Sequence, residues 1–95
     1  MIISFGDKET EKIFNEEFSK KLPIDIQRSA SRKLQILNAV NSLQELYSPP
    51  SNHLEPLTGQ RVGEWSTRIN KQWRITFIPI DSGKNYANVK IEDYH

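Results

Sequence analysis

The chain has 95 residues, which suits one domain (residues 1–95) with a modest hydrophobic core that needs neither metal nor disulfides. It holds 13 Lys+Arg against 12 Asp+Glu, a formal net charge of +1, so the composition does not indicate the broad basic surface of a general nucleic-acid-coating protein. Cysteine is absent, which excludes a disulfide scaffold and a thiol nucleophile. No apolar run approaches the roughly 20 residues of a membrane helix, and we expect a soluble, cytoplasmic protein.

The first quarter of the chain predicts a short strand and then a helix. Weak alternation in the segment IISF predicts a strand with Ile3 and Phe5 facing inward. Asp7 stands where a helix N-cap belongs, ahead of KETEKIFNEEFSKK, and Pro23 is expected to end this helix. The narrow apolar stripe of the helix consists of Ile13, Phe14 and Phe18.

A second, longer helix is predicted to start at Ile24 or Asp25 and to end before the two prolines of SPPSNH. The basic and amide residues on its outer face fit either a solvated surface, which is the simpler interpretation, or a nucleic-acid contact. One face carries apolar residues at helical spacing, namely Ile26, Ala30, Leu34, Leu37, Val40 and Leu43. The other face carries Arg28, Arg32, Lys33, Asn38 and Asn41.

After the prolines, the apolar period changes from 3.6 to 2, which is typical of strands. Two alternating segments, WSTRI and WRITF, are followed by the turn-rich PIDSGKN and by a last predicted strand, YANVKIEDYH. Helices first and strands afterwards favour an α+β fold, with two N-terminal helices packed on a small antiparallel β-sheet. No repeat or linker divides the chain, so we expect a single domain.

The segment STRINKQWRITF predicts a β-hairpin whose register follows from its apolar residues. Pairing Ile69 with Trp73 leaves the three-residue loop NKQ and keeps both apolar faces on one side. Arg68 and Arg74 then become direct neighbours on the other face of the hairpin, with Cβ atoms about 4.5–5.5 Å apart. The same register pairs Thr67 with Ile75 and Trp65 with Phe77.

The paired arginines need an explanation, because like charges directly opposite each other repel and this hairpin face holds no acidic residue. A phosphodiester would fit the fork geometry of both guanidinium groups. Alternatively, the arginines are solvated or pair with Glu64, Glu92 or another surface carboxylate. The hairpin alone does not decide between these interpretations.

Two further groups of titratable residues are candidates for proton transfer. Alternation from Val89 and Ile91 continues through Asp93 to His95, so an otherwise apolar face ends in a carboxylate and an imidazole. Tyr94, on the opposite face, could stack on an unpaired base. A frayed polar tail is the alternative. His53 and Glu55 are the second group, for which a plain surface loop is the simpler interpretation.

Taken together, the chain resembles the HigB branch of the RelE-type toxins of bacterial toxin–antitoxin modules. The resemblance extends over the whole chain. It depends on GQRVGEW, on TRINKQWRI and on a chain that stops at Asp-Tyr-His. No P-loop, Gly-rich dinucleotide turn or nucleophile elbow points elsewhere.

The resemblance implies a fold similar to that of small microbial ribonucleases and cleavage of messenger RNA in the A site of a 70S ribosome, without metal or cofactor. It also implies a HigA-type helix-turn-helix antitoxin as partner, with operator DNA bound only through the antitoxin complex. By this resemblance the catalytic residues are Arg68, Arg74, Asp93, Tyr94 and His95. We also expect Arg61, Lys71 and His53 to contact RNA or the ribosome.

One departure from the family pattern concerns the segment His-Pro-Leu-Lys-Gly, where this chain has Glu55-Pro56-Leu57-Thr58-Gly59. The missing lysine would have helped to neutralise the scissile phosphate, so Thr58 favours a weak or non-catalytic homologue that acts mainly as an antitoxin-binding co-repressor. A free-standing RNA-binding domain is a third interpretation, but two arginines are too few for it. For the ribonuclease we expect a 2′-hydroxyl attack on phosphorus, with Asp93 or His95 as general base or acid.

Overall fold

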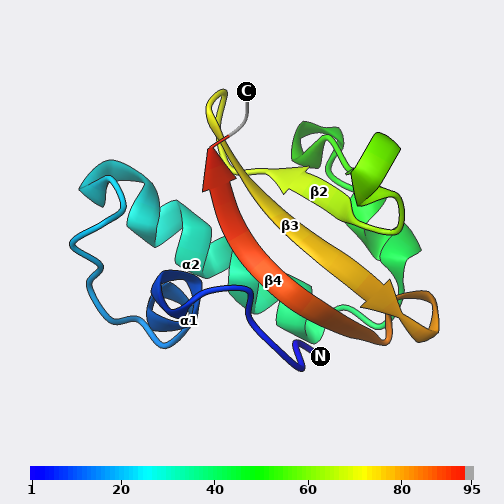
Figure 1. Ribbon diagram of the computed structural model, residues 1–95, viewed down its shortest axis with the longest axis horizontal. Helices are drawn as coiled ribbons and strands as arrows, with labels where there is room; N and C mark the ends of the chain where they lie inside the picture. The colour runs from blue at the N-terminus through cyan, green and yellow to red at the C-terminus, as the bar shows by residue number, and fades with distance from the viewer. Residues whose placement is uncertain (94–95) are drawn as a thin grey trace.

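The computed structural model describes residues 1–93 and has an α+β architecture with a four-stranded antiparallel sheet in the order β1-β2-β3-β4. The two helices, α1 (Lys8–Phe14) and α2 (Ile24–Ala39), pack on one face of this sheet. In Figure 1, β3 and β4 cross in front of α2, and α1 lies beside it. The strands are β1 (Glu55–Pro56), β2 (Trp65–Arg68), β3 (Trp73–Ile80) and β4 (Asn85–Asp93).

Helix α1 is shorter than predicted. Asp7 caps it as expected, because its side chain accepts a hydrogen bond from the Thr10 amide at 2.7 Å. The helix ends at Phe14 rather than near Pro23, because Glu16 adopts a left-handed conformation (φ 61°) that reverses the chain. Phe18 therefore lies outside the helix and is 60% exposed, so its assignment to the apolar stripe was wrong.

Helix α2 starts at Ile24, as predicted, and Pro23 is its N-cap. It ends at Ala39, so Val40 and Leu43 pack against the core from beyond the helix. Two short 3₁₀ helices follow, η1 (Leu43–Tyr47) and η2 (Pro50–Asn52). The core between helices and sheet contains Ile13, Ile26, Ala30, Leu34, Leu37, Leu46, Ile75, Phe77, Tyr86, Val89 and Ile91.

The N-terminal segment runs parallel to β4 and adds isolated bridges to its outer edge. The pairs are Ile2 with Tyr86 and Phe5 with Val89. Ile2 and Phe5 pack against the core, whereas Ile3 is 55% exposed, so the predicted inward position of Ile3 was wrong. The segment is not a regular strand, and alternation counted back from Phe5 therefore selects the wrong isoleucine.

The hairpin register is confirmed. Trp65 pairs with Phe77, Thr67 with Ile75, and Arg68 with Arg74, while the Ile69 amide donates to the Trp73 carbonyl at 2.9 Å. Asn70 closes the loop, because its side-chain oxygen accepts from the amides of Gln72 and Trp73. The two arginines thus lie side by side on the face of the sheet that points away from the helices.

Candidate functional site

The outer face of the sheet carries two rows of polar side chains. In one row Arg68 on β2 lies opposite Arg74 on β3, which in turn lies opposite Glu92 on β4. In the neighbouring row Glu55 on β1 lies opposite Ser66, and Ser66 lies opposite Thr76. The hairpin itself holds no carboxylate on this face, but the strands on either side of it supply two.

Arg74 is the most buried charged residue of these rows, with only 8% of the residue exposed. Its Nη1 donates to the Ser66 hydroxyl at 2.7 Å and to the His53 carbonyl at 3.3 Å, and it lies 3.3 Å from Oε1 of Glu55. Arg74 therefore pairs with a surface carboxylate, which was one of the alternatives that the sequence left open. A buried guanidinium fixed at one edge by three acceptors is a rigid donor for an anion.

His53 connects the two arginines. It adopts a left-handed conformation (φ 46°, ψ 49°) at the end of η2, and its ring atom Nε2 lies 3.0 Å from Nη1 of Arg68. Arg68 also donates from Nε to the Asn70 carbonyl at 3.2 Å. Because β1 begins only at Glu55, strand alternation does not determine on which face of the sheet the side chain of His53 lies. Its left-handed turn brings it to Arg68 instead.

Arg61 is held by carboxylates. It donates to Glu64 at 2.9 and 3.1 Å and to Glu92 at 2.5 and 3.1 Å, and the Thr76 hydroxyl also donates to Glu92. Hydrogen bonds to Glu64 and Glu92 raise the pKa of Arg61 above its usual range. Burial would raise the pKa of Glu92, but hydrogen bonds from Arg61 and Thr76 outweigh it and lower that pKa below its usual value. This network attaches the 3₁₀ helix η3 (Gly59–Arg61) to β4.

These side chains surround a hollow of about 250 Å³ on the outer face of the sheet. Its lining includes Thr58, Arg61, Ser66, Arg74, Thr76 and Asp93. Thr58, for which the sequence resemblance leads us to expect a lysine, is exposed at the N-cap of η3. The hollow thus brings a buried guanidinium, hydroxyl groups and carboxylates together, which are the groups that bind a phosphodiester and move protons.

Of the remaining predicted site residues, Asp93 and Lys71 lie at or near this end of the sheet. Asp93 ends β4 opposite Trp73 and accepts a hydrogen bond from Nε2 of Gln72 at 3.1 Å. Lys71 is exposed in the hairpin loop. Tyr94 and His95 lie outside the described residues. Strand alternation places Ser66 and Thr76 on the same face as the two arginines, but sequence reasoning did not identify them as site residues.

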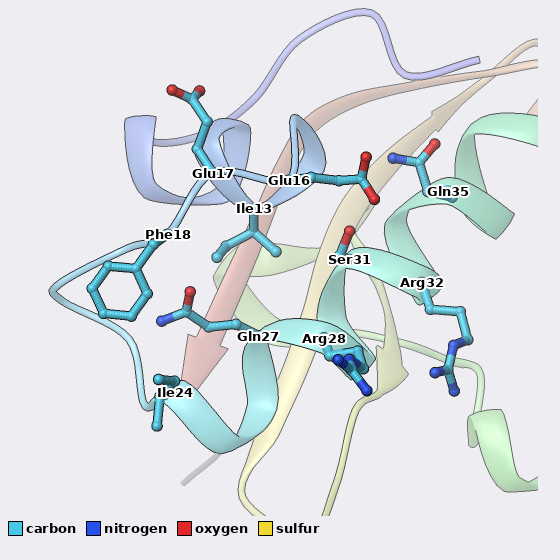
Figure 2. A pocket seen from close by; sticks show the side chains of 10 residues that line it. All are labelled: Ile13, Glu16, Glu17, Phe18, Ile24, Gln27, Arg28, Ser31, Arg32 and Gln35. Carbon is cyan, nitrogen blue, oxygen red and sulfur yellow. The ribbon is translucent and has the colours of Figure 1, made fainter.

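A second hollow, of about 650 Å³, lies between the helices and away from the arginines of the sheet. Figure 2 shows Glu16 and Phe18, from the segment after α1, on one side of it and Ile24, Arg28 and Arg32 of α2 on the other. Its charged groups do not converge on one point as those of the sheet face do. Residues 1–93 contain no cluster of three acidic or histidine side chains that could hold a metal ion, and none of their helices is long and apolar enough to cross a membrane.

Comparison with known structures supports the fold. The YoeB/ParE toxin from Agrobacterium tumefaciens superposes with a TM-score of 0.58 at 17% identity, covering 99% of this chain and 98% of that one. YafQ from E. coli superposes with a TM-score of 0.59 at 13% identity, covering 98% of this chain and 93% of that one. At such identities the likeness concerns the fold alone.

Comparison with known sequences identifies the family. Toxin HigB-1 of Vibrio cholerae is 37% identical over 82 residues, which are 85% of this chain and 86% of that protein. Endoribonuclease HigB of Proteus vulgaris is 32% identical over 95 residues and the full length of both chains. The sequence model of one protein family, the RelE-like HigB toxins of type II toxin–antitoxin systems, matches residues 3–95 of this chain. The chain therefore belongs to the HigB-like toxin family, and membership of such a module implies an antitoxin partner.

Proposed function

We propose that this chain is an endoribonuclease that cleaves messenger RNA in the A site of the 70S ribosome and thereby inhibits translation in the cytoplasm. The observation that supports this most directly is the pairing of Arg68 with a buried, rigidly held Arg74 beside the polar hollow. Full-length similarity to a protein named Endoribonuclease HigB adds to it. A HigA-type helix-turn-helix antitoxin neutralises the toxin, and operator DNA is bound only through their complex.

In this proposal the 2′-hydroxyl of one nucleotide attacks the adjacent phosphorus and the 5′-oxygen leaves, without metal. Arg74 and Arg68 stabilise the charge that develops on the phosphorane oxygens, because both guanidinium groups face the same side of the sheet. Asp93 or His95 serves as general base or acid, and Tyr94 stacks on a base. Arg61, Lys71 and His53 contact RNA or the ribosome, with Arg61 fixed by its carboxylates and His53 beside Arg68.

The test is the cleavage of a messenger RNA programmed in the A site of purified ribosomes by the wild type and by Arg74→Ala. We expect rapid cleavage by the wild type and a loss of roughly 100-fold or more in the variant, because one transition-state contact to an arginine contributes a few kcal/mol. Arg32→Ala, an exposed position on α2, is the matched control and should cleave normally. Wild-type activity in Arg74→Ala would contradict the assigned roles.

A second candidate function is favoured by one observation. Thr58 lines the hollow where the family pattern has a lysine, so the phosphate would meet one positive charge fewer. In that case the chain is a non-catalytic homologue whose work is to bind the antitoxin and adjust repression. Absence of cleavage by a folded wild type, with cleavage gained in Thr58→Lys, would favour this alternative.

A further inference from the structure

Asn52 is a buried polar residue beside the candidate site that the proposed mechanism does not use. Its Nδ2 donates to the Leu46 carbonyl at 3.1 Å and to the Ser48 carbonyl at 3.4 Å. Its Oδ1 accepts a hydrogen bond from the ammonium group of Lys33 at 3.3 Å. The side chain of Asn52 therefore joins α2 to the turn between η1 and η2, and this turn leads directly into the site.

Lys33 adds a charge to this contact. The sequence predicts Lys33 on the outer face of its helix, as part of a solvated surface or a nucleic-acid contact, but its side chain is half-buried and reaches Asn52. Burial, with a smaller contribution from the charge of Arg32, lowers the pKa of Lys33 below its usual value. Hydrogen bonds from a charged donor are stronger than those between neutral groups, so the pair attaches the turn firmly to α2.

The side chain of Asn52 has little room to move. A hollow of only about 20 Å³ lies between α2, η2 and β2, and its lining includes Lys33, Asn52 and Thr67. A space of that size holds one water molecule at most. The backbone is fixed as well, because the amide of Asn52 donates to the Pro49 carbonyl at 3.0 Å and the next amide donates to the Pro50 carbonyl at 3.1 Å.

The next residue along the chain, His53, contacts both arginines of the hairpin. Its carbonyl accepts from Nη1 of Arg74 at 3.3 Å, and its ring atom Nε2 lies 3.0 Å from Nη1 of Arg68. It reaches both because of its left-handed conformation, which is uncommon for a residue other than glycine and persists only when the surroundings hold it. Asn52 holds the chain one residue earlier, so a shift of Asn52 would be passed on to both guanidinium groups.

We propose that Asn52 is a positioning residue for the cleavage reaction, an inference that rests on the proposed ribonuclease function. Held by Lys33, it fixes the turn of His53, and His53 in turn fixes Arg68 and Arg74 relative to each other. Electrostatic stabilisation depends on donors that are already in place when charge develops on the phosphorane oxygens. Asn52 therefore contributes to the rate of cleavage without touching RNA.

The opposing interpretation is purely structural: Asn52 attaches the segment of η1 and η2 to α2 and has no effect on the arginines. Its removal would then lower the stability of the fold but leave the rate per folded molecule and the surroundings of the His53 ring unchanged. The ring can be followed by NMR, because the chain has only two histidines, His53 and His95. The signals of His53 are assigned by their loss in His53→Asn, since asparagine tolerates a left-handed conformation.

The experiment measures single-turnover cleavage of A-site messenger RNA over a range of ribosome concentrations, at a temperature at which circular dichroism shows each variant to be folded. Asn52→Ala should lose about 10- to 100-fold in the rate at saturation, with the half-saturating ribosome concentration changed less than about threefold, because misplaced catalytic groups weaken the transition state more than binding. The His53 ring signals should shift as well. Lys33→Met should show smaller effects of the same kind. Asn15→Ala and Lys20→Met, at exposed positions, are the matched controls.

A wild-type rate or unshifted His53 signals in folded Asn52→Ala would overturn the inference. If Asn52→Ala does not fold, Lys33→Met decides: a loss of rate together with shifted His53 signals supports the inference, and the absence of either overturns it. If Asn52→Ala cleaves normally while Arg74→Ala does not, the ribonuclease stands and only the role of Asn52 falls. If the folded wild type does not cleave, both proposals fall together.

Discussion

Arg74 carries a full positive charge into a nearly buried position, and removing such a charge from water is costly unless polar partners replace the solvent. The Ser66 hydroxyl, the His53 carbonyl and the Glu55 carboxylate replace it at Nη1. Ser66 is itself fully buried, so water does not compete with its hydroxyl for the hydrogen bond from the guanidinium group. The geometry of the candidate site therefore depends on a residue that carries no charge.

Replacing Ser66 by alanine tests that dependence. The variant leaves a buried guanidinium nitrogen without its 2.7 Å acceptor. Since hydrogen bonds to charged groups contribute about 1.5–3 kcal/mol, we expect the free energy of unfolding in urea to fall by about that amount. Ser51→Ala, at an exposed position in η2, should change it by less than about 0.5 kcal/mol. Equal values for the two variants would contradict this role of Ser66.

In contrast to Arg74, Tyr86 buries a polar group in the core without a hydrogen-bond partner among residues 1–93. Its ring meets Phe77 edge to face at 5.1 Å, but its hydroxyl is buried with no hydrogen-bond partner in residues 1–93. Burial, reinforced by the charge of Glu45, raises the pKa of Tyr86 from 10.0 to about 12. A raised pKa means that the unfolded chain ionises first, so stability is complete below pH 10 and is lost as the pH rises towards 12.

We therefore expect Tyr86→Phe to raise the free energy of unfolding at pH 7 by about 1 kcal/mol, because it removes an unsatisfied polar group and keeps the ring. Above pH 10 the gain should grow, since phenylalanine cannot ionise in the unfolded chain. Tyr47→Phe, at a 56% exposed tyrosine, should leave the free energy of unfolding at pH 7 unchanged. A loss of stability in Tyr86→Phe would mean that the hydroxyl has a partner.

Among the elements, the hairpin could be predicted from the sequence and the end of α1 could not. The apolar residues of WSTRI and WRITF fit only one register, so Arg68 and Arg74 had to be neighbours. The end of α1 depends on Glu16 in a left-handed conformation, for which the sequence has no glycine as a signal. The sequence left open which carboxylate pairs with Arg74, because Glu55 lies on β1, whose two residues are too few to show alternation.

The N-terminal segment offers a matched pair of variants, because two adjacent isoleucines have different environments. Ile2 pairs with Tyr86 along β4 and packs against the core, whereas Ile3 is 55% exposed. We expect Ile2→Ala to lower the free energy of unfolding by about 1–2 kcal/mol, since its side chain is only partly buried, and Ile3→Ala to lower it by less than about 0.5 kcal/mol. Chemical denaturation measures both. The reverse order would mean that Ile3, as alternation predicted, faces inward.

At the scale of the whole molecule, the candidate site is balanced in charge. Its three arginines, Arg61, Arg68 and Arg74, are matched in number by the carboxylates of Glu55, Glu64 and Glu92. The whole chain has a net charge of only +1. The composition excludes a broad basic surface. A small site on the sheet face can still bind a phosphate, because a few well-placed arginines are enough for that. Arg61 and Arg74 are held in place by carboxylates, so the site is rigid but exerts little long-range attraction on RNA.

This balance predicts poor action on free RNA. A ribosome can supply the position and the unstacked geometry of the substrate, whereas a naked strand must be captured by phosphate contacts that this surface scarcely offers. We expect cleavage of purified RNA to be at least about 100-fold slower than cleavage of the same message in the A site. Binding of free RNA should weaken only gently with salt, with a log–log slope no steeper than about −2, since each phosphate contact on a single strand contributes about −0.7.

Gel assays with and without ribosomes, and fluorescence titrations over a range of salt, measure these two quantities. Glu64→Gln provides the matched variant, because it removes one negative charge from the network of Arg61 and leaves Arg74 and Glu55 in place. That variant should bind free RNA more tightly than the wild type. Tight, strongly salt-dependent binding of free RNA by the wild type would instead indicate a self-sufficient RNA-binding surface. It would contradict the view that the charge balance of the sheet face limits action on free RNA.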